Sequence, residues 1–156
     1  MNYVVMGVSG CGKSTVGAAF AAAIAGRFVD GDDLHPPENV VKMSAGQPLT
    51  DADRWPWLDR VGAALTGNVV VGCSALKRAY RDRIRAVAGP VQFLHLAGSR
   101  KVIAARMAAR PGHFMPLGLL DSQFAALEPL AKDEDGVTVD IDQPFDAIVA
   151  ALLSHD

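Results

Sequence analysis

The sequence has little of what secreted, membrane-embedded and nucleic-acid-binding proteins require. Two cysteines in 156 residues can build neither a disulfide framework nor a zinc site of the usual ligand spacing. The formal net charge of −2 argues against a polyanionic partner such as nucleic acid, and no apolar run is long enough to cross a bilayer. The chain opens on a predicted core strand, with no signal sequence before it. These absences predict a cytoplasmic protein that binds neither nucleic acid nor membranes.

A glycine-rich stretch from Gly7 to Thr15 fits the phosphate-binding pattern Gly-x4-Gly-Lys-Ser/Thr at every fixed position. It lies between an apolar run, residues 3–6, and a segment of helical periodicity, which is the context that such a loop requires. Its glycines let consecutive main-chain N–H groups converge on phosphate oxygens, aided by the helix dipole. We expect Lys13 to reach the β- and γ-phosphates and the Ser14 hydroxyl to ligate Mg²⁺. The predicted triphosphate site consists of Gly7, Ser9, Gly10, Cys11, Gly12, Lys13, Ser14 and Thr15.

Apolar segments alternate with helical ones along the whole chain, which implies a parallel sheet with helices on both faces. The five predicted strands are residues 3–6, 27–29, 68–73, 91–96 and 137–141. A first strand that feeds a phosphate loop makes this an α/β P-loop fold, a three-layer α/β/α sandwich in one domain over residues 1–156. By analogy with small P-loop kinases, we expect the strand order 2-3-1-4-5 and a lid segment at about 106–128. In the third helix, Pro56 favours a start nearer Trp55 than Thr50.

Two carboxylates follow the second predicted strand, in the segment Asp30-Gly31-Asp32. Ligands of open α/β sheets bind at the carboxyl ends of the strands, so both side chains are expected near the γ-phosphate. One carboxylate can hold Mg²⁺ or its waters, and the other can accept a proton from an attacking hydroxyl. The alternative is an acidic turn, because Asp-Gly is common in turns.

Basic residues lie on both sides of the central predicted strand, residues 68–73. Lys77 follows this strand and Arg54 precedes it. We expect both to bind the anionic group of a small substrate, since charge-assisted hydrogen bonds suit a carboxylate. For Arg81, a substrate contact and a solvated helix face stay equally open, whereas for Arg85 we favour the solvated face.

Arg106 and Arg110 lie one turn apart on a predicted helix that runs into the irregular segment 111–118. Phosphoryl transfer needs positive charge that neutralises the transition state and a lid that excludes water. The two arginines and the breaker-rich segment match that need. The alternative is an ordinary surface helix that carries two arginines.

Six motifs together resemble the gluconate kinase family over nearly the whole chain. They are Gly7-Val-Ser-Gly-Cys-Gly-Lys-Ser14, Asp30-Gly-Asp-Asp-Leu-His-Pro36, Asp51-Ala-Asp-Arg-Trp-Pro-Trp-Leu58, Cys73-Ser-Ala-Leu-Lys-Arg-Ala-Tyr-Arg81, Arg110-Pro-Gly-His-Phe114 and Val139-Asp-Ile-Asp-Gln-Pro144. The resemblance implies transfer of the γ-phosphate of ATP to the 6-hydroxyl of D-gluconate, with Mg²⁺ as cofactor. It also implies a cytoplasmic homodimer.

The resemblance assigns roles residue by residue. It makes Lys13 catalytic within the ATP site, gives Asp32 the sugar hydroxyl as a catalytic and substrate-binding residue, and places Asp30 at the metal beside Ser14. Positions that face the gluconate or the closing lid are His35, Arg54, Lys77 and His113, with Arg81 as a further substrate-binding candidate. The lid-side arginines are Arg106 and the catalytic Arg110, and the loop beside the adenine is Gln143–Pro144. Pro111 and Met115–Pro116 make the flap stiffer than the family's more polar version.

Two rival functions stay open. One is another small-molecule kinase of the shikimate kinase type, although Gly72-Cys73-Ser74-Ala75 stands where that family has a glycine-rich turn. The other is a nucleotide-binding regulator that transfers no phosphate, against which the Asp32 carboxylate and the basic residues argue. For Cys11, which stands where the family commonly has serine, we weigh a thiol pKa lowered by the helix N-terminus against an inert small residue, and favour the latter.

Overall fold

The computed structural model describes residues 1–109 and 117–155, and within them five strands form one parallel sheet. The strands are β1 (Tyr3–Met6), β2 (Arg27–Asp30), β3 (Val69–Gly72), β4 (Gln92–Ala97) and β5 (Gly136–Asp140). Their order in the sheet is β2-β3-β1-β4-β5, and every neighbouring pair is parallel. This confirms the strand order expected from the sequence.

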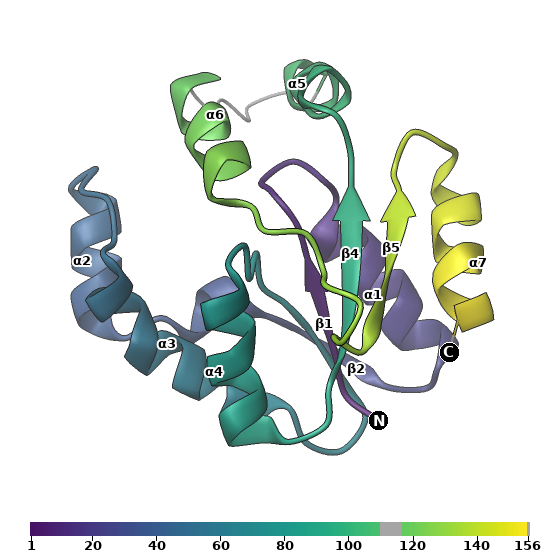
Figure 1. The fold of residues 1–156 in the computed structure, drawn as a ribbon, viewed down its shortest axis with the longest axis horizontal. Helices are drawn as coiled ribbons and strands as arrows, with labels where there is room; N and C mark the ends of the chain where they lie inside the picture. The colour runs from purple at the N-terminus through teal and green to yellow at the C-terminus, as the bar shows by residue number, and fades with distance from the viewer. Residues whose placement is uncertain (110–116, 156) are drawn as a thin grey trace.

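Helices cover both faces of the sheet, as Figure 1 shows. The helices are α1 (Lys13–Ala23), α2 (Pro37–Ser44), α3 (Asp51–Ala64), α4 (Arg78–Ala88), α5 (Arg100–Ala108), α6 (Leu117–Ala126) and α7 (Phe145–His155), with a short 3₁₀ turn, η1 (Gly31–Leu34), after β2. The helices α1 and α7 lie on one face, and α3 and α4 lie on the other. The predicted three-layer sandwich is therefore confirmed.

Alternate residues of the central strand point into two separate cores. Val5 of β1 belongs to the core under α1 and α7, which includes Phe20 and Leu152. Its neighbour Val4 belongs to the core under α3 and α4, which includes Leu58. Because successive side chains of a strand point to opposite faces, a central strand buried on both sides must be apolar throughout. These two cores hold the sheet so that the carboxyl ends of β1, β2 and β3 meet at one edge.

The start of α3 differs from the sequence-based expectation. Thr50 caps this helix: its hydroxyl accepts a hydrogen bond from the Asp53 N–H at 3.2 Å, and the Asp53 carboxylate accepts one from the Thr50 N–H at 2.9 Å. This reciprocal capping box starts the helix at Asp51. Pro56 lies inside it and has no N–H to donate to the carbonyl of Ala52, which is an exposed residue. Across residues 1–109 and 117–155, no helix combines the length and apolar character needed to span a membrane.

Candidate active site

The loop between β1 and α1 has the shape of a phosphate-binding loop. Gly10 and Gly12 have φ angles of +84° and +94°, which residues with a side chain rarely adopt. Gly12 also caps α1, so the N–H groups at the positive end of that helix face the loop. The Lys13 ammonium donates to the carbonyl oxygens of Gly7 at 2.9 Å and Val8 at 3.2 Å. The lysine therefore lies over the same loop whose main-chain N–H groups would bind phosphate.

A cavity of about 90 Å³ joins this loop to the two carboxylates that follow β2. It is lined by Ser9, Lys13, Ser14, Asp30, Asp32, Gly72, Cys73 and Ser74. Sheet register explains the proximity, because Asp30 pairs with Gly72 across β2 and β3, and Gly72 pairs with Val5 across β3 and β1. The structure thus brings the predicted residues Lys13, Ser14, Asp30 and Asp32 to one place.

The two carboxylates differ in their surroundings. The Asp30 carboxylate accepts a hydrogen bond from the Asp32 N–H at 3.0 Å. Burial, and then the negative charge of Asp30, raise the pKa of Asp32 above that of an ordinary aspartate. A raised pKa makes a carboxylate a better proton acceptor, which is the property that a general base needs.

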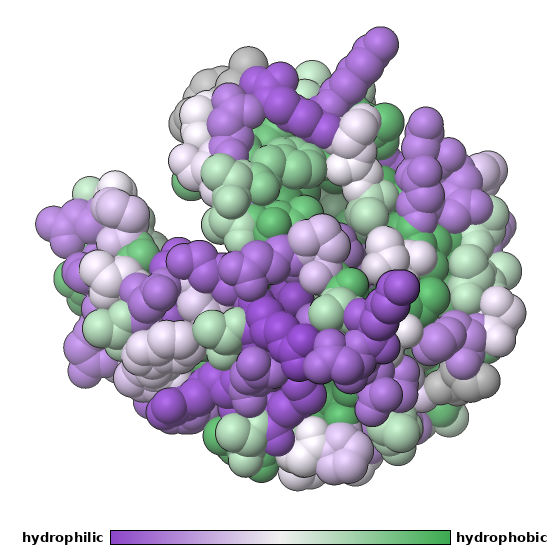
Figure 2. All heavy atoms as spheres, viewed as in Figure 1, coloured by the Kyte–Doolittle hydropathy of each residue, from purple (hydrophilic) through white to green (hydrophobic). Residues whose placement is uncertain are grey.

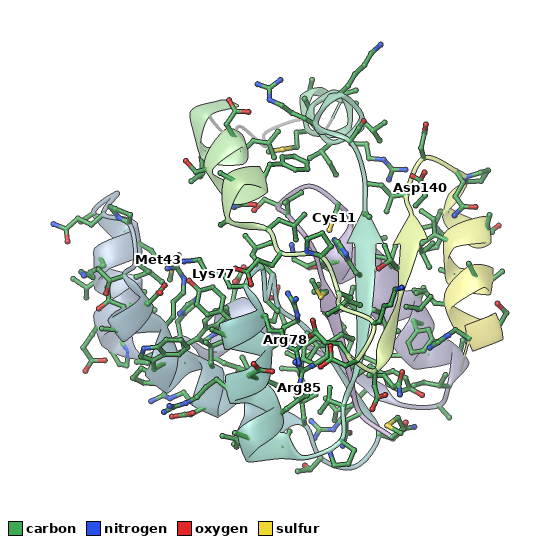
Figure 3. All side chains as sticks on the ribbon, viewed as in Figure 1. Cys11, Met43, Lys77, Arg78, Arg85 and Asp140 are labelled. Carbon is green, nitrogen blue, oxygen red and sulfur yellow. The ribbon has the colours of Figure 1, made fainter. Side chains whose placement is uncertain are left out.

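A second and larger cavity, of about 330 Å³, lies beside the first. It is lined by Pro48, Arg54, Trp57, Ser74, Leu76, Lys77, Tyr80, Leu119, Ser122, Gln123 and Ala126. Figure 2 shows this face of the molecule hollowed between α2 and α6. In Figure 3, Lys77 lies at the start of α4, on the side that faces Met43 of α2, whereas Arg85 lies farther along α4. Ser74 lines both cavities, so the two are adjacent.

Two cations and a tyrosine surround one carboxylate at the wall of the larger cavity. The Asp51 carboxylate accepts a hydrogen bond from the Tyr80 hydroxyl, which is the first cause of its lowered pKa. Its oxygens lie 3.7 Å from Arg54 Nη1 and 3.8 Å from Lys77 Nζ, too far for strong hydrogen bonds. Both cations also lie 5.6 Å from the centre of the Tyr80 ring. Arg54 and Lys77 are therefore held in place while part of their hydrogen-bonding capacity stays available.

His35 is packed behind Asp32. Its ring stacks on Trp57 at a centroid distance of 4.2 Å, and its Nδ1 lies 3.1 Å from the Asn39 side-chain nitrogen. Burial lowers the pKa of His35, which favours the neutral form of the ring. The Trp57 indole N–H in turn donates to the Gly31 carbonyl at 2.8 Å. The stack thus braces the turn between Asp30 and Asp32.

Arg81 takes neither of the two roles left open for it, a substrate contact or a solvated helix face. Its side chain is 1% exposed and forms two hydrogen bonds with Glu134, at 2.8 and 3.0 Å. It also donates to the Ala75 carbonyl at 2.9 Å. Burial raises the pKa of Glu134, but hydrogen bonds lower it to about 2. The largest of these lowering contributions is the hydrogen bond from Arg81. Arg81 therefore fixes the loop before α4 from behind and has no side-chain surface left for a ligand.

Arg85 was expected on a solvated face of its helix, but its side chain contacts acidic residues and an aromatic ring instead. Its guanidinium pairs with Glu134 at 2.9 Å and with Asp82 at 2.8 Å, and it lies 5.0 Å from the centre of the Phe93 ring. The cause is the same for both arginines. The buried carboxylate of Glu134 draws two cations from the inner side of α4.

The predicted adenine side of the site lies beyond β5. The Arg106 guanidinium donates to the Ile141 carbonyl, and the Gln143 amide donates to the Asp140 carbonyl at 2.7 Å. Arg106 is thus tied to the loop that contains Gln143 and Pro144. Arg110 and His113, together with the rest of the flap at 110–116, lie outside the described residues.

The thiol of Cys11 is not activated. The side chain has no exposed surface, and burial raises its pKa above that of an ordinary cysteine. The positive charge of Lys13 lowers the pKa, but by less than burial raises it. Both features argue against a reactive thiol and favour Cys11 as a small core residue beneath the loop.

The sequence and the fold of this chain are both similar to those of known proteins. The thermosensitive gluconokinase of Escherichia coli K12 is 49% identical over 149 residues, which cover 90% of this chain and 79% of that protein. The chain belongs to the gluconokinase family. The gluconokinase of Gluconobacter oxydans 621H is 46% identical, with 97% of this chain and 89% of that protein covered. The crystal structure of a gluconokinase from Sinorhizobium meliloti 1021 is 52% identical, has a TM-score of 0.91, and is matched over 99% of this chain and 90% of that one.

The wider relationship of this gluconokinase-family chain is to shikimate kinases. The shikimate kinase family model matches residues 9–135. The shikimate kinase from Bacteroides thetaiotaomicron is 17% identical with a TM-score of 0.71, and covers 97% of this chain and 96% of its own. At that identity the likeness shows a common fold alone.

Sequence reasoning missed several residues of this gluconokinase-family site. Ser74 ends the apolar run of β3, and a small polar residue at the carboxyl end of a central strand is a signal that points to a ligand site. Asp51 and Tyr80 carried no such signal, because an aspartate in the first turn of α3 and a tyrosine on the buried side of α4 are ordinary helix residues. Gln123 lies on α6, and nothing in its neighbourhood in the sequence distinguishes it from a surface residue.

Proposed function

We propose that this chain transfers the γ-phosphoryl group of ATP to the 6-hydroxyl of D-gluconate, giving 6-phosphogluconate and ADP. One observation carries the proposal: the phosphate-loop cavity with Asp32 adjoins a cavity with two cations, and Ser74 lines both. The choice of gluconate as the substrate rests on the relatives, which are gluconokinases. A short polyol acid fits this pair of cavities, because its carboxylate suits the cations and its far hydroxyl suits Asp32.

Different residues bind the substrate, accept the proton and stabilise the transferred phosphoryl group. Arg54 and Lys77 hold the carboxylate of gluconate, which directs the 6-hydroxyl to Asp32. The Asp32 carboxylate accepts the proton of that hydroxyl as the oxygen attacks the γ-phosphorus. Lys13 stabilises the negative charge on the phosphoryl oxygens. On the basis of the family resemblance, His35 and His113 belong to the gluconate side, and the catalytic Arg110 faces the transferred group.

The residues of the small cavity suit Mg²⁺. Ser14, Asp30 and Asp32 present oxygen donors, and Mg²⁺ prefers a few such ligands together with waters and phosphate oxygens. Within the described part of the chain, no three His, Cys, Asp or Glu side chains converge as a metal cage. In the proposed complex, the hydroxyl of Ser14 and the carboxylate of Asp30 would hold the ion together with ATP. When bound, Mg²⁺ neutralises charge on the transferring phosphate.

The remaining nucleotide contacts rest on the same resemblance. Main-chain N–H groups of residues 10–15 would bind the phosphates, since the Ser9 N–H already bonds to the Gln123 side chain. Arg106 and the Gln143–Pro144 loop would lie beside the adenine, and Arg106 is already tied to that loop at Ile141. A cytoplasmic homodimer completes the proposal, and light scattering of the purified protein at micromolar concentration tests the dimer.

A coupled assay of ADP release tests the substrate. ATP and Mg²⁺ are supplied with gluconate, shikimate or other sugar acids, and the phosphorylated product is identified by mass spectrometry. We expect gluconate to give the highest kcat/KM and 6-phosphogluconate to form. A preference for shikimate would support the rival kinase, and ATP binding without turnover on any of these acids would support a regulator.

A further inference from the structure

The side chain of Gln123 forms a reciprocal pair with the phosphate loop. Its Oε1 accepts a hydrogen bond from the Ser9 main-chain N–H at 2.6 Å, and its Nε2 donates to the Ser9 hydroxyl at 2.9 Å. Both polar atoms of the Gln123 side chain are thus hydrogen-bonded to Ser9, which lies 114 positions away in the sequence. A partly buried amide with two short hydrogen bonds fixes the relative position of the segments that it joins.

This pair lies where the two cavities meet. Gln123 lines the larger cavity together with Arg54 and Lys77. Ser9, its partner, lines the smaller cavity together with Asp32. The bonds between Gln123 and Ser9 therefore join the wall of the proposed gluconate pocket to the loop that would hold the triphosphate.

A second link joins the segment after α6 to the same pocket. The Glu128 N–H donates to the Leu76 carbonyl at 2.7 Å, and the Glu128 carboxylate accepts from the Arg78 N–H at 2.8 Å. Helix α6 is thus fixed to the β3–α4 loop just past its end and to the phosphate loop through Gln123. The pocket wall between these two points has little freedom to move relative to the phosphate loop.

We propose that Gln123 is a positioning residue, which acts through Ser9 to set the distance between the phosphate loop and the acceptor pocket. The proposal rests on the function proposed above. Transfer requires the acceptor oxygen to lie about 3–3.5 Å from the phosphorus, and an error of about 1 Å costs on the order of 100-fold in rate. Attack of water on the γ-phosphate requires no such alignment by the pocket. Loss of the pair should therefore slow transfer to gluconate more than it slows hydrolysis of ATP.

The test compares Gln123→Met with Gln123→Glu. Methionine keeps the length and bulk of glutamine in a helix but makes neither hydrogen bond. Glutamate can still accept from the Ser9 N–H and from its hydroxyl. The matched control is Asp121→Ala on the same helix, which cuts the ion pair with Arg100 on the outer side of α6. Initial rates of 6-phosphogluconate and ADP formation are measured in parallel, with the ATP dissociation constant and the unfolding temperature of each variant.

We expect Gln123→Met to lower kcat for transfer by about 10–100-fold and to raise the ratio of ADP to 6-phosphogluconate above that of the parent chain. Its ATP dissociation constant should stay within about 3-fold of the parent value, since the phosphate-binding N–H groups of residues 10–15 are untouched. Gln123→Glu should restore the ratio towards the parent value, and Asp121→Ala should leave it unchanged.

Two results would overturn the proposal. One is a Gln123→Met variant whose transfer rate and product ratio match those of a parent chain that phosphorylates gluconate. The other is an equal change in Asp121→Ala, which would assign the effect to the packing of α6. A parent chain that phosphorylates no gluconate is a distinct outcome: it would refute the proposed function, and the role of Gln123 with it.

Discussion

The phosphate loop and the acceptor pocket are built in opposite ways. The loop is one continuous stretch, Gly7 to Thr15, and its binding groups are main-chain N–H groups whose direction is set by glycine φ angles. The acceptor pocket is assembled from side chains of α3, α4, α6 and the loop before α4. A site made of backbone depends on local conformation, whereas a site made of side chains depends on which side of each helix faces inward.

Arg81 and Lys77 show what this difference means for specific residues. Both are cations, and they stand one helical turn apart. Lys77 is the N-cap of α4 and its ammonium faces the pocket, whereas Arg81 is buried against Glu134. Glu134, 53 residues later in the chain, holds Arg81 away from the pocket that Lys77 lines.

Removal of the proposed base should have the largest effect. For Asp32→Asn we expect kcat to fall by about 10²–10⁴-fold, because the amide cannot accept the proton, while ATP still binds. Steady-state kinetics with gluconate and a separate ATP titration check this.

The same base gives the parent protein a pH dependence. A general base must be unprotonated to accept a proton, so activity should fall as the pH drops through the raised pKa of Asp32. The acid limb of kcat/KM should lie above the ordinary aspartate value of about 3.9, and a limb below it would contradict the assignment.

Breaking the buried ion pair should have the largest effect on stability. Arg81→Leu leaves the Glu134 carboxylate without its main partner, which should cost about 3–5 kcal/mol in the free energy of unfolding. The double variant Arg81→Leu with Glu134→Leu is the control and should recover part of that loss. Denaturant unfolding measures both. If Arg81→Leu folds as stably as the parent but binds gluconate poorly, our account of Arg81 is wrong.

The same pair gives stability a defined dependence on pH. The pKa of Glu134 is about 2 in the folded protein, below the usual value of about 4.3 for an unfolded glutamate. Its contribution is therefore complete above about pH 4.3 and is lost as the pH falls towards 2. Glu134→Gln should flatten the stability profile in this window, as unfolding at a series of pH values would show.

Changes at the acceptor pocket should be smaller and confined to one substrate. For Lys77→Met we expect KM for gluconate to rise by about 10–100-fold, which corresponds to the loss of one charge-assisted hydrogen bond of about 1.5–3 kcal/mol. KM for ATP should change by less than about 3-fold, because the phosphate loop is separate. Tyr80→Phe, which frees Asp51 but keeps both cations, is the matched control. Equal increases in both KM values would show that the two regions are not independent.

The smallest expected effect concerns the thiols. Cys11 and Cys73 are both buried, and burial raises the pKa of Cys73 to about 12. Neither should react with iodoacetamide in the folded protein within minutes at pH 7.5, whereas both should react in denaturant. Mass spectrometry of the intact protein counts the adducts. Modification of native Cys11 that ATP prevents would restore the reactive-thiol hypothesis.

Whereas the strand order came from analogy with small P-loop kinases, the sequence by itself determined the phosphate loop, the five strands and the two carboxylates after β2. These features depend on local patterns: glycine spacing, continuous apolar runs and the strand–loop–helix succession that fixes what lies at a carboxyl edge. It misjudged the start of α3, because propensity counted Pro56 against a helix that the capping box at Thr50 starts all the same.

Only the tertiary structure decided which basic residues are available to a substrate and what joins the two halves of the site. Glu134 draws Arg81 inward, Asp51 and Tyr80 hold Arg54 and Lys77 at the pocket wall, and Gln123 reaches Ser9. Apart from the Asp51–Arg54 contact within α3, these contacts link residues from different elements, at distances of up to 114 positions along the chain. Such contacts leave no periodic or local signal, because they are set by how helices pack over a sheet rather than by any neighbour in the sequence.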